Sequence, residues 1–568
     1  MFASASHEQN FSMTNPIHNP KHSVSSRRRF LSAAGGALGA APVLRASAQQ
    51  STSHGESTGT QADESRLRQM YEIRTQAARS HVTEPIPKHL TNGDETRYPN
   101  RIGNFSKGLP HDQWGEVDPS AYESLLRALS TGDPEDFEQI RMGGSVALVD
   151  PQAGLAFDLE GVDSHETYLP PAPALASARR AAEAVELYWQ AILRDVPFSQ
   201  YSTHPLAQQA IEELNCLSDF GGPRDPVTGK ISAQTLFRGF TPHDVIGPYI
   251  SQFLYFPLQY GAAQITQRFQ TLLPIAGGGA DWLTDYGSWL RCQNGEAPFD
   301  QNRYDLVLRY MRCGRDISQY VHVDVLFEAY FNACLWLIDN GAPLSPTNPY
   351  LRSRTQTGFG TFGAPHIKTM VAEVATRALK CVWFQKWFVH RVLRPEAFGG
   401  LVHNTLTNTR LYPLHGDILN SKAVQQVFTR DGTYLLPHAF AEGCPQHPSY
   451  GQGHGTVAGA CATIVKAFFD ESWVIPNPVV ASDDGLSLVP YTGADAGQLT
   501  VGGEMNKIAA NIAIGRNHAA VHWRSDYEVS LRLGEQIAIS ILRDQRRTYS
   551  ESFTGFMFTS FDGEKITV

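Results

Sequence analysis

Three short segments, far apart in the chain, combine basic side chains, histidines and glycines. The first carries Lys386 and Arg394 near the end of a helix that apolar periodicity predicts over 367–393. On a regular helix these two residues would lie about 80° apart with roughly 12 Å of rise. They converge only if the chain bends between them or both long side chains reach inward. A basic helix C-terminus that complements the helix dipole is the simpler interpretation of this segment alone.

The second segment is a glycine-rich turn in front of a helix predicted from Thr456 to Phe469. Gly451, Gly453 and Gly455 surround His454 in it. Such a turn directs free backbone N–H groups at the start of a helix toward an anion, which His454 would also reach. Glycines needed only for the shape of the backbone explain the same pattern equally well.

The third segment holds Arg516, His522 and Asp526, between helices predicted over 503–514 and 526–542. Asp526 follows His522 by one helical turn, so its carboxylate is placed to accept from one ring nitrogen and fix the tautomer. A surface ion-pair network is at least as good an explanation of this segment alone. Taken together, the three segments supply three cations, two histidines and a helix N-terminus, which suits a tetrahedral oxyanion such as phosphate or vanadate.

The order and spacing of these segments resemble the vanadium-dependent haloperoxidases, which share their motifs with acid phosphatases of the phosphatidic-acid phosphatase superfamily. The family pattern is Lys-x(6 or 7)-Arg-Pro, then Pro-Ser-Gly-His, then Ser-Arg-x5-His-x3-Asp. It reads here as Lys386…Arg394-Pro395, Gly451-Gln452-Gly453-His454 and Gly515-Arg516…His522…Asp526. The gap between Lys386 and Arg394, and His447 seven residues before His454, are similar to the red-algal and cyanobacterial bromoperoxidases in particular.

The resemblance implies a role for each residue. His522 would bind the vanadium of a vanadate cofactor and Asp526 would orient that ring. The remaining contacts implied for vanadate are those of Lys386, Arg394, Arg516, Gln452, Gly453 and His454. Lys386, His454 and His522 would be catalytic, with His454 acting as acid and base, and His447 would lie near the halide. Gln452 replaces a serine whose hydroxyl donates to a vanadate oxygen in the family.

The activity implied is the oxidation of bromide or iodide by hydrogen peroxide to hypohalous acid, which halogenates an organic nucleophile. Two alternatives stay open. The pocket would serve an acid phosphatase with His522 as nucleophile and His454 protonating the leaving group. Alternatively, Gln452 leaves a weakened oxyanion-binding paralogue. The resemblance also implies a homo-oligomer, either a dimer or a dodecamer.

The elements that must position these residues are helices. Apolar residues spaced three and four apart also predict a helix over Ala174–Val196. We expect a mainly α fold with two four-helix bundles, long loops and a few short hairpins, one of them at Asp562-Gly563. The expected division is an N-terminal helical region over 65–340 and a C-terminal vanadate-binding bundle over 341–568, within one large catalytic unit.

The composition and the N-terminal segment limit which partners, cellular location and cysteine chemistry we expect. The 568 residues have a formal net charge of −9, which disfavours nucleic acid as a partner. The twin arginines of Ser26–Leu31, a short apolar run and an A-x-A site at 46–48 predict a twin-arginine export signal over 1–48 and a periplasmic or extracellular enzyme. That run is too short to span a bilayer, and residues 49–64 read as a flexible tail. The seven cysteines form no CxxC pair and show no zinc spacing.

Overall fold

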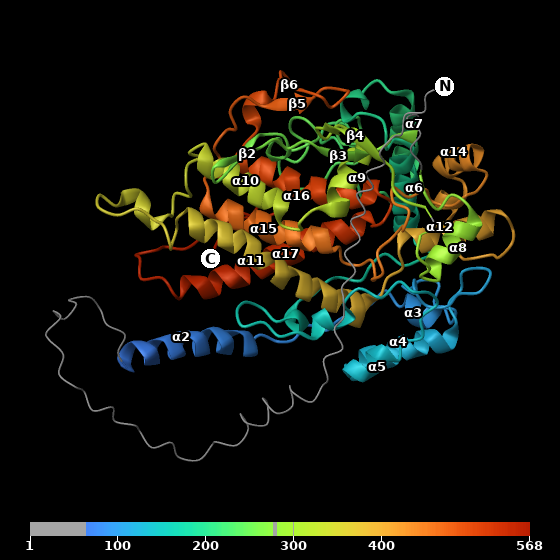
Figure 1. Ribbon diagram of the computed structural model, residues 1–568, viewed down its shortest axis with the longest axis horizontal. Coiled ribbons are helices and arrows are strands. Elements are labelled where there is room, and N and C mark those ends of the chain that lie inside the picture. The colour runs from blue at the N-terminus through green and yellow to red at the C-terminus, as the bar shows by residue number, and fades with distance from the viewer. Residues whose placement is uncertain (1–63, 276–280, 299) are drawn as a thin grey trace, which may run out of the picture. The chain divides into compact units, whose positions relative to one another are not determined.

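Four long helices form the central bundle of the computed structural model (Figure 1). They are α11 (Ala364–Phe384), α15 (Gly453–Phe468), α16 (Val501–His518) and α17 (Arg524–Arg546), and they pack on one another through α15. The structure describes residues 64–275, 281–298 and 300–568, and residues 67–568 form one compact unit. The predicted export signal and all but the last residue of the predicted tail lie outside the described residues.

Small residues let α15 and α17 approach closely. A side chain on Gly459 would place its Cβ 2.1 Å from the Leu531 carbonyl oxygen, and one on Gly534 would place it 2.0 Å from the Thr456 oxygen. Both distances are far inside van der Waals contact, so glycine is required on each side of this crossing. Both helices carry residues of the candidate site, and the crossing therefore sets their separation.

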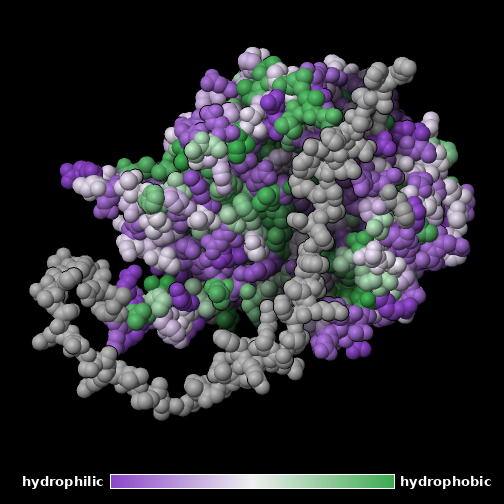
Figure 2. All heavy atoms as spheres, viewed as in Figure 1, coloured by the Kyte–Doolittle hydropathy of each residue, from purple (hydrophilic) through white to green (hydrophobic). Residues whose placement is uncertain are grey.

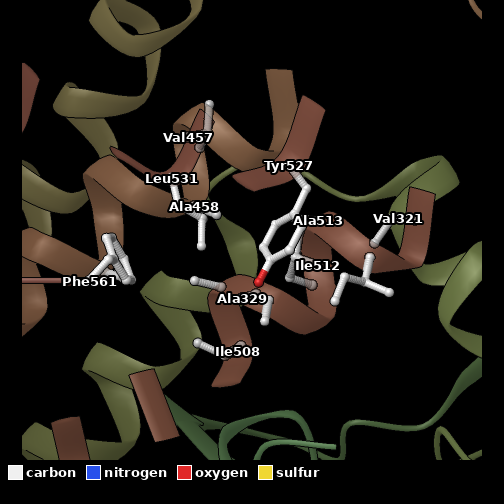
Figure 3. Close-up of a cluster of buried hydrophobic side chains, with 14 of the residues drawn as sticks. Val321, Ala329, Val457, Ala458, Ile508, Ile512, Ala513, Tyr527, Leu531 and Phe561 are labelled. Carbon is white, nitrogen blue, oxygen red and sulfur yellow. The ribbon is translucent and has the colours of Figure 1, made fainter. Parts of the chain in front are cut away.

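The core between these helices is apolar (Figure 3). Helices α9 (Gly314–Val323) and α10 (Glu328–Asp339) add side chains to it. The labelled members in Figure 3 are Val321, Ala329, Val457, Ala458, Ile508, Ile512, Ala513, Tyr527, Leu531 and Phe561. Helix α16 is buried at every position, because other helices and loops cover all its sides.

A second, smaller group of helices surrounds α6 (Ala178–Ile192), which is buried along most of its length. Its neighbours are α7 (Pro205–Cys216), α13 (Gly416–Leu419) and α14 (Lys422–Asp431). The remaining helices are α2 (Glu64–Val82), α3 (Asp94–Arg97), α4 (Pro119–Thr131), α5 (Pro134–Glu138), α8 (Tyr286–Gln293) and α12 (Pro395–Leu406).

Strands are short and occur in four antiparallel pairs in the described part of the chain. The pairs are β1 (Leu258–Tyr260) with β2 (Ala263–Ile265), β3 (Phe269–Leu272) with β4 (Tyr304–Arg309), β5 (Val479–Ala481) with β6 (Leu488–Pro490), and β7 (Met557–Thr559) with β8 (Lys565–Thr567). The last pair is the predicted C-terminal hairpin, with Gly563 at a positive φ of 86° in its turn. The prediction of a mainly α fold of packed helices with short hairpins is confirmed.

One predicted helix ends in a way the sequence did not suggest. After α11 the chain continues as a π-helix, η7 (Gln385–His390), and Arg391 then adopts a left-handed conformation with φ of 43°. The helix therefore stops before residue 393, and the chain turns sharply before Pro395 begins α12. This turn lies between Lys386 and Arg394, where a bend is needed for their side chains to meet.

Within the described ranges, no single helix is long and apolar enough to cross a bilayer. In the same ranges, α9 and α10 are the one pair of helices that together reach that length and hydropathy, and the chain bends by 96° between them. Both are largely buried inside the fold. Figure 2 shows hydrophilic residues over much of the face in view, interrupted by separate hydrophobic patches.

Candidate active site

The turn after η7 brings the first segment against the third. Arg394 Nη1 lies 2.9 Å from His522 Nε2, and Arg394 Nη2 lies 2.9 Å from His447 Nδ1. The guanidinium also donates to the carbonyl oxygens of His447 at 2.8 Å and Val521 at 2.7 Å. Burial lowers the pKa of Arg394 to about 10. Residues separated by more than a hundred positions in the sequence thus meet around one guanidinium.

Lys386 approaches the same place from η7. Its Nζ donates to the carbonyl oxygens of Pro448 and Ser449, each at 2.8 Å, and lies 5.7 Å from the centre of the Trp383 ring. Burial, together with the positive charge of Arg394, lowers the pKa of Lys386 well below its usual value. An ammonium in this position lacks the solvation that would stabilise its charge.

Arg516 completes a set of three buried cations. Its Nη1 donates to the Val321 carbonyl oxygen at 2.6 Å, while its buried Nε has no hydrogen-bond partner. Lys386, Arg394 and Arg516 are 0%, 1% and 6% exposed. Among the described residues, none of the three forms an ion pair with a carboxylate; their hydrogen bonds go to backbone carbonyls and histidine nitrogens. Buried charges are normally paired, so this cluster is suited to an anion.

His522 is held in one orientation by Asp526. The carboxylate accepts from His522 Nδ1 at 2.8 Å, from the backbone N–H of Trp523 at 3.1 Å, and from the Ser449 hydroxyl. Because Nδ1 donates to Asp526, the lone pair of the neutral ring is on Nε2, beside Arg394. Burial and the charges of Arg394 and Lys386 lower the pKa of His522 well below 6.5, which favours this neutral form.

The glycine-rich segment contributes the start of α15. Gln452 is its N-cap residue and Gly453 its first residue, so the N–H groups of this turn lie at the positive end of the helix dipole. The Gln452 side chain donates through Nε2 to the Ala513 carbonyl oxygen at 2.9 Å, while its buried Oε1 has no partner. One of its two amide hydrogens is therefore already used, and Gln452 remains a predicted vanadate ligand.

His454 lies on the second position of α15 and is partly exposed. Its Nε2 lies 3.0 Å from Asp324 Oδ1, in the connection between α9 and α10. The same connection begins near Val321, whose carbonyl accepts from Arg516. His454 has no direct hydrogen bond to the buried cations within the described part of the chain. His447, by contrast, is packed at 4.7 Å against the Trp383 ring and contacts Arg394 directly.

Two residues at this site were not expected from the sequence. Asp324 is a single acid between two helical segments, and no spacing relates it to His454. Ser449 joins Lys386 to Asp526, since its carbonyl accepts from the first and its hydroxyl donates to the second. Its position two residues before Gly451 of the glycine-rich turn was the only signal in the sequence.

Comparisons of sequence and of structure find vanadium-dependent bromoperoxidases among the relatives of this chain. A family model described as the VCPO second helical-bundle domain matches residues 368–551. A vanadium-dependent bromoperoxidase of Corallina pilulifera is 36% identical over 89% of this chain and 99% of its own length. One of Ascophyllum nodosum is 34% identical over 81% of this chain and 86% of its own length. A homohexameric vanadate-dependent bromoperoxidase structure from Ascophyllum nodosum superposes with a TM-score of 0.84 and 30% identity, covering 93% of this chain and 94% of that one.

Proposed function

We propose, since this chain belongs to the vanadium-dependent bromoperoxidase family, that its buried basic site binds vanadate and that the enzyme uses hydrogen peroxide to oxidise bromide or iodide. The product, a hypohalous acid, would halogenate an organic nucleophile. The observation that carries the proposal is the cluster of Lys386, Arg394 and Arg516, three buried cations without a carboxylate partner in the described ranges, facing a neutral His522. A bound oxyanion would balance the charge of this cluster.

The donor set fits vanadate. The three cations would hold its oxygens, and His522 Nε2 would be the atom that binds the metal, because Asp526 occupies the other ring nitrogen. The Gly453 N–H at the start of α15 and the second amide hydrogen of Gln452 are further candidate donors. When bound, vanadate supplies a Lewis-acid centre that activates peroxide without a change in oxidation state.

Residues of the chain would stabilise negative charge on the substrate and transfer protons. Lys386, without a carboxylate partner among the described residues, would donate to an oxygen of the bound substrate and draw electron density from it. His454 would exchange protons at Nδ1, since Nε2 is engaged by Asp324. Its partial exposure gives those protons a route to solvent.

Bromination measured against phosphate-ester hydrolysis tests the proposal. Enzyme reconstituted with vanadate should brominate monochlorodimedone in the presence of peroxide and bromide, and His522→Ala should abolish that reaction. Hydrolysis of p-nitrophenyl phosphate without vanadate, combined with no bromination, would favour the phosphatase. If Gln452 has left only a weakened binding site, the wild type should brominate poorly and Gln452→Ser should restore the activity.

Assembly and export complete the proposal. The chain would form a homo-oligomer, which is supported by the homohexameric Ascophyllum nodosum relative. Light scattering on the purified enzyme distinguishes a hexamer from the dimer or dodecamer expected from the sequence. Export by the twin-arginine route, with cleavage after residue 48, is tested by N-terminal sequencing of the mature enzyme and by replacing Arg27 and Arg28 with lysine.

A further inference from the structure

Helix α6 presents three buried charged side chains to the start of α17. Arg180, Glu183 and Glu186 are spaced three residues apart, so they lie along one side of α6. The segment that they contact lies between His522 and Asp526. Each of the three meets a different one of the consecutive residues Trp523, Arg524 and Ser525.

The first contact links two parts of the site. The Arg180 guanidinium lies 4.2 Å from the centre of the Trp523 ring, and both side chains are completely buried. The indole Nε1 of Trp523 donates to the carbonyl oxygen of Leu393 at 3.1 Å. Leu393 directly precedes Arg394. The ring under Arg180 therefore joins the backbone next to His522 to the backbone next to Arg394.

The other two contacts fix the backbone of the segment. Glu183 Oε1 accepts from the Ser525 N–H at 2.9 Å, at the positive end of α17. Glu186 receives two hydrogen bonds from Arg524, one of them from Nε at 2.8 Å. This bidentate pair is fully buried, and such pairs restrict both distance and angle. The first turn of α17 thus has little freedom to rotate or translate.

We propose that Arg180, Glu183 and Glu186 are positioning residues that hold His522 and Asp526 in register with Arg394 through the segment 523–525. None of the three has a contact with the buried cations in the described structure; they act through Trp523, Arg524 and Ser525. The inference rests on the proposed function of the site as a vanadate-binding centre. Its consequence is that part of the vanadate affinity is set by α6, outside the three sequence motifs.

The test compares Arg180→Met with Arg180→Lys and Arg179→Gln in the full chain. Calorimetric titration of the metal-free enzymes with orthovanadate gives the dissociation constants. Arg180→Met should weaken binding about 10- to 100-fold, as expected when a residue behind a metal ligand is lost. Arg180→Lys should lie between the methionine variant and the wild type. Arg179→Gln removes an equal charge from the neighbouring position, where Arg179 pairs with Asp219 at 2.9 Å, and should bind like the wild type.

Unfolding measurements and the effect of lysine separate positioning from a general loss of structure. Positioning predicts that Arg180→Met still unfolds cooperatively while it binds orthovanadate weakly, and that Arg180→Lys recovers part of the lost affinity. A folded Arg180→Met variant with wild-type affinity would overturn the inference, as would an equal loss of affinity in Arg179→Gln. If Arg180→Met does not fold, Trp523→Phe should weaken orthovanadate binding instead, and wild-type affinity in that variant would overturn the inference. A wild type that does not bind vanadate refutes the proposed function instead.

Discussion

Replacing Arg516 by methionine should make the enzyme without its oxyanion more stable, although it damages the site. Arg516 is buried, has no carboxylate partner within the described residues, and leaves its Nε without a hydrogen bond. Burial lowers its pKa, which is the sign of a charge that folding disfavours. Methionine fills a similar volume without that charge. Stability and oxyanion binding therefore oppose each other at this position.

The expected change in the free energy of unfolding follows from the contacts that Arg516 makes. Burying an ion costs several kcal/mol after relaxation. The variant loses one hydrogen bond to Val321, worth about 1 kcal/mol, and the contact of the guanidinium with the Phe440 ring at 5.8 Å, worth roughly another 1 kcal/mol. We therefore expect a net gain of about 1–2 kcal/mol in the free energy of unfolding without an oxyanion.

Adding the oxyanion should make the wild type more stable than Arg516→Met. At a concentration one hundred times the dissociation constant, vanadate stabilises the wild type by about 2.7 kcal/mol. If Arg516→Met weakens binding about 100-fold, the same concentration stabilises the variant by only about 0.4 kcal/mol. The wild type then becomes the more stable protein.

Unfolding of both proteins with and without orthovanadate, at one scan rate, measures these differences. Inorganic phosphate serves as a parallel probe for a tetrahedral oxyanion. Arg532→Met is the matched control, because Arg532 is a partly exposed arginine of α17 paired with Asp562 at 2.6 Å, and it should keep the wild-type response to vanadate. The reasoning is refuted if Arg516→Met unfolds more easily than the wild type without oxyanion and keeps the full vanadate response.

Three further predictions concern other parts of the fold. Gly534→Ala should lower the free energy of unfolding by about 2 kcal/mol or more and weaken vanadate binding, because its Cβ would lie 2.0 Å from the Thr456 oxygen; unfolding and titration measure both, and an unchanged protein would contradict the close crossing. Asp526→Asn should weaken vanadate binding about 10- to 100-fold, since the neutral amide no longer raises the basicity of His522; equal affinity by titration would contradict that role. Burial lowers the pKa of His438 to about 4, so the unfolded chain binds the extra proton first and stability falls as the pH drops from 6.5 toward 4. His438→Phe, which loses no hydrogen bond at the ring, should reduce this acid sensitivity by roughly 3 kcal/mol in pH-dependent unfolding, whereas an unchanged pH profile would show that the ring is not buried neutral.

The sequence predicted the helices whose apolar spacing is uninterrupted. The helix expected over Ala174–Val196 is α6, and those expected from Thr456, from residue 503 and from Asp526 are α15, α16 and α17 with small differences at their ends. The end of α11 was not predicted, because the apolar pattern continues through the π-helix to residue 390. Only the left-handed Arg391, a rare conformation for this residue type, turns the chain there.

The sequence identified a candidate set of residues, but it did not predict the burial and electrostatic environment of these residues. Lys386 and Arg394 alone are explained most simply as a basic helix C-terminus that complements the helix dipole, yet both are buried among distant segments. That burial comes from packing against segments more than fifty positions away, such as Pro448 and Val521. The contacts of Asp324 and of α6 likewise depend on tertiary structure, and no spacing in the sequence encodes them.

The end of α9 and the connection that follows it restrict where insertions and deletions can occur. Val321 and Asp324 lie three residues apart, and they contact Arg516 and His454 respectively. Deleting one residue between them would rotate the second by about 100° around the helix axis relative to the first. Such a deletion would prevent one of these two residues from keeping its contact while the other kept its own. We therefore expect insertions and deletions in homologous chains to fall beyond Asp324, toward α10, rather than between these two positions.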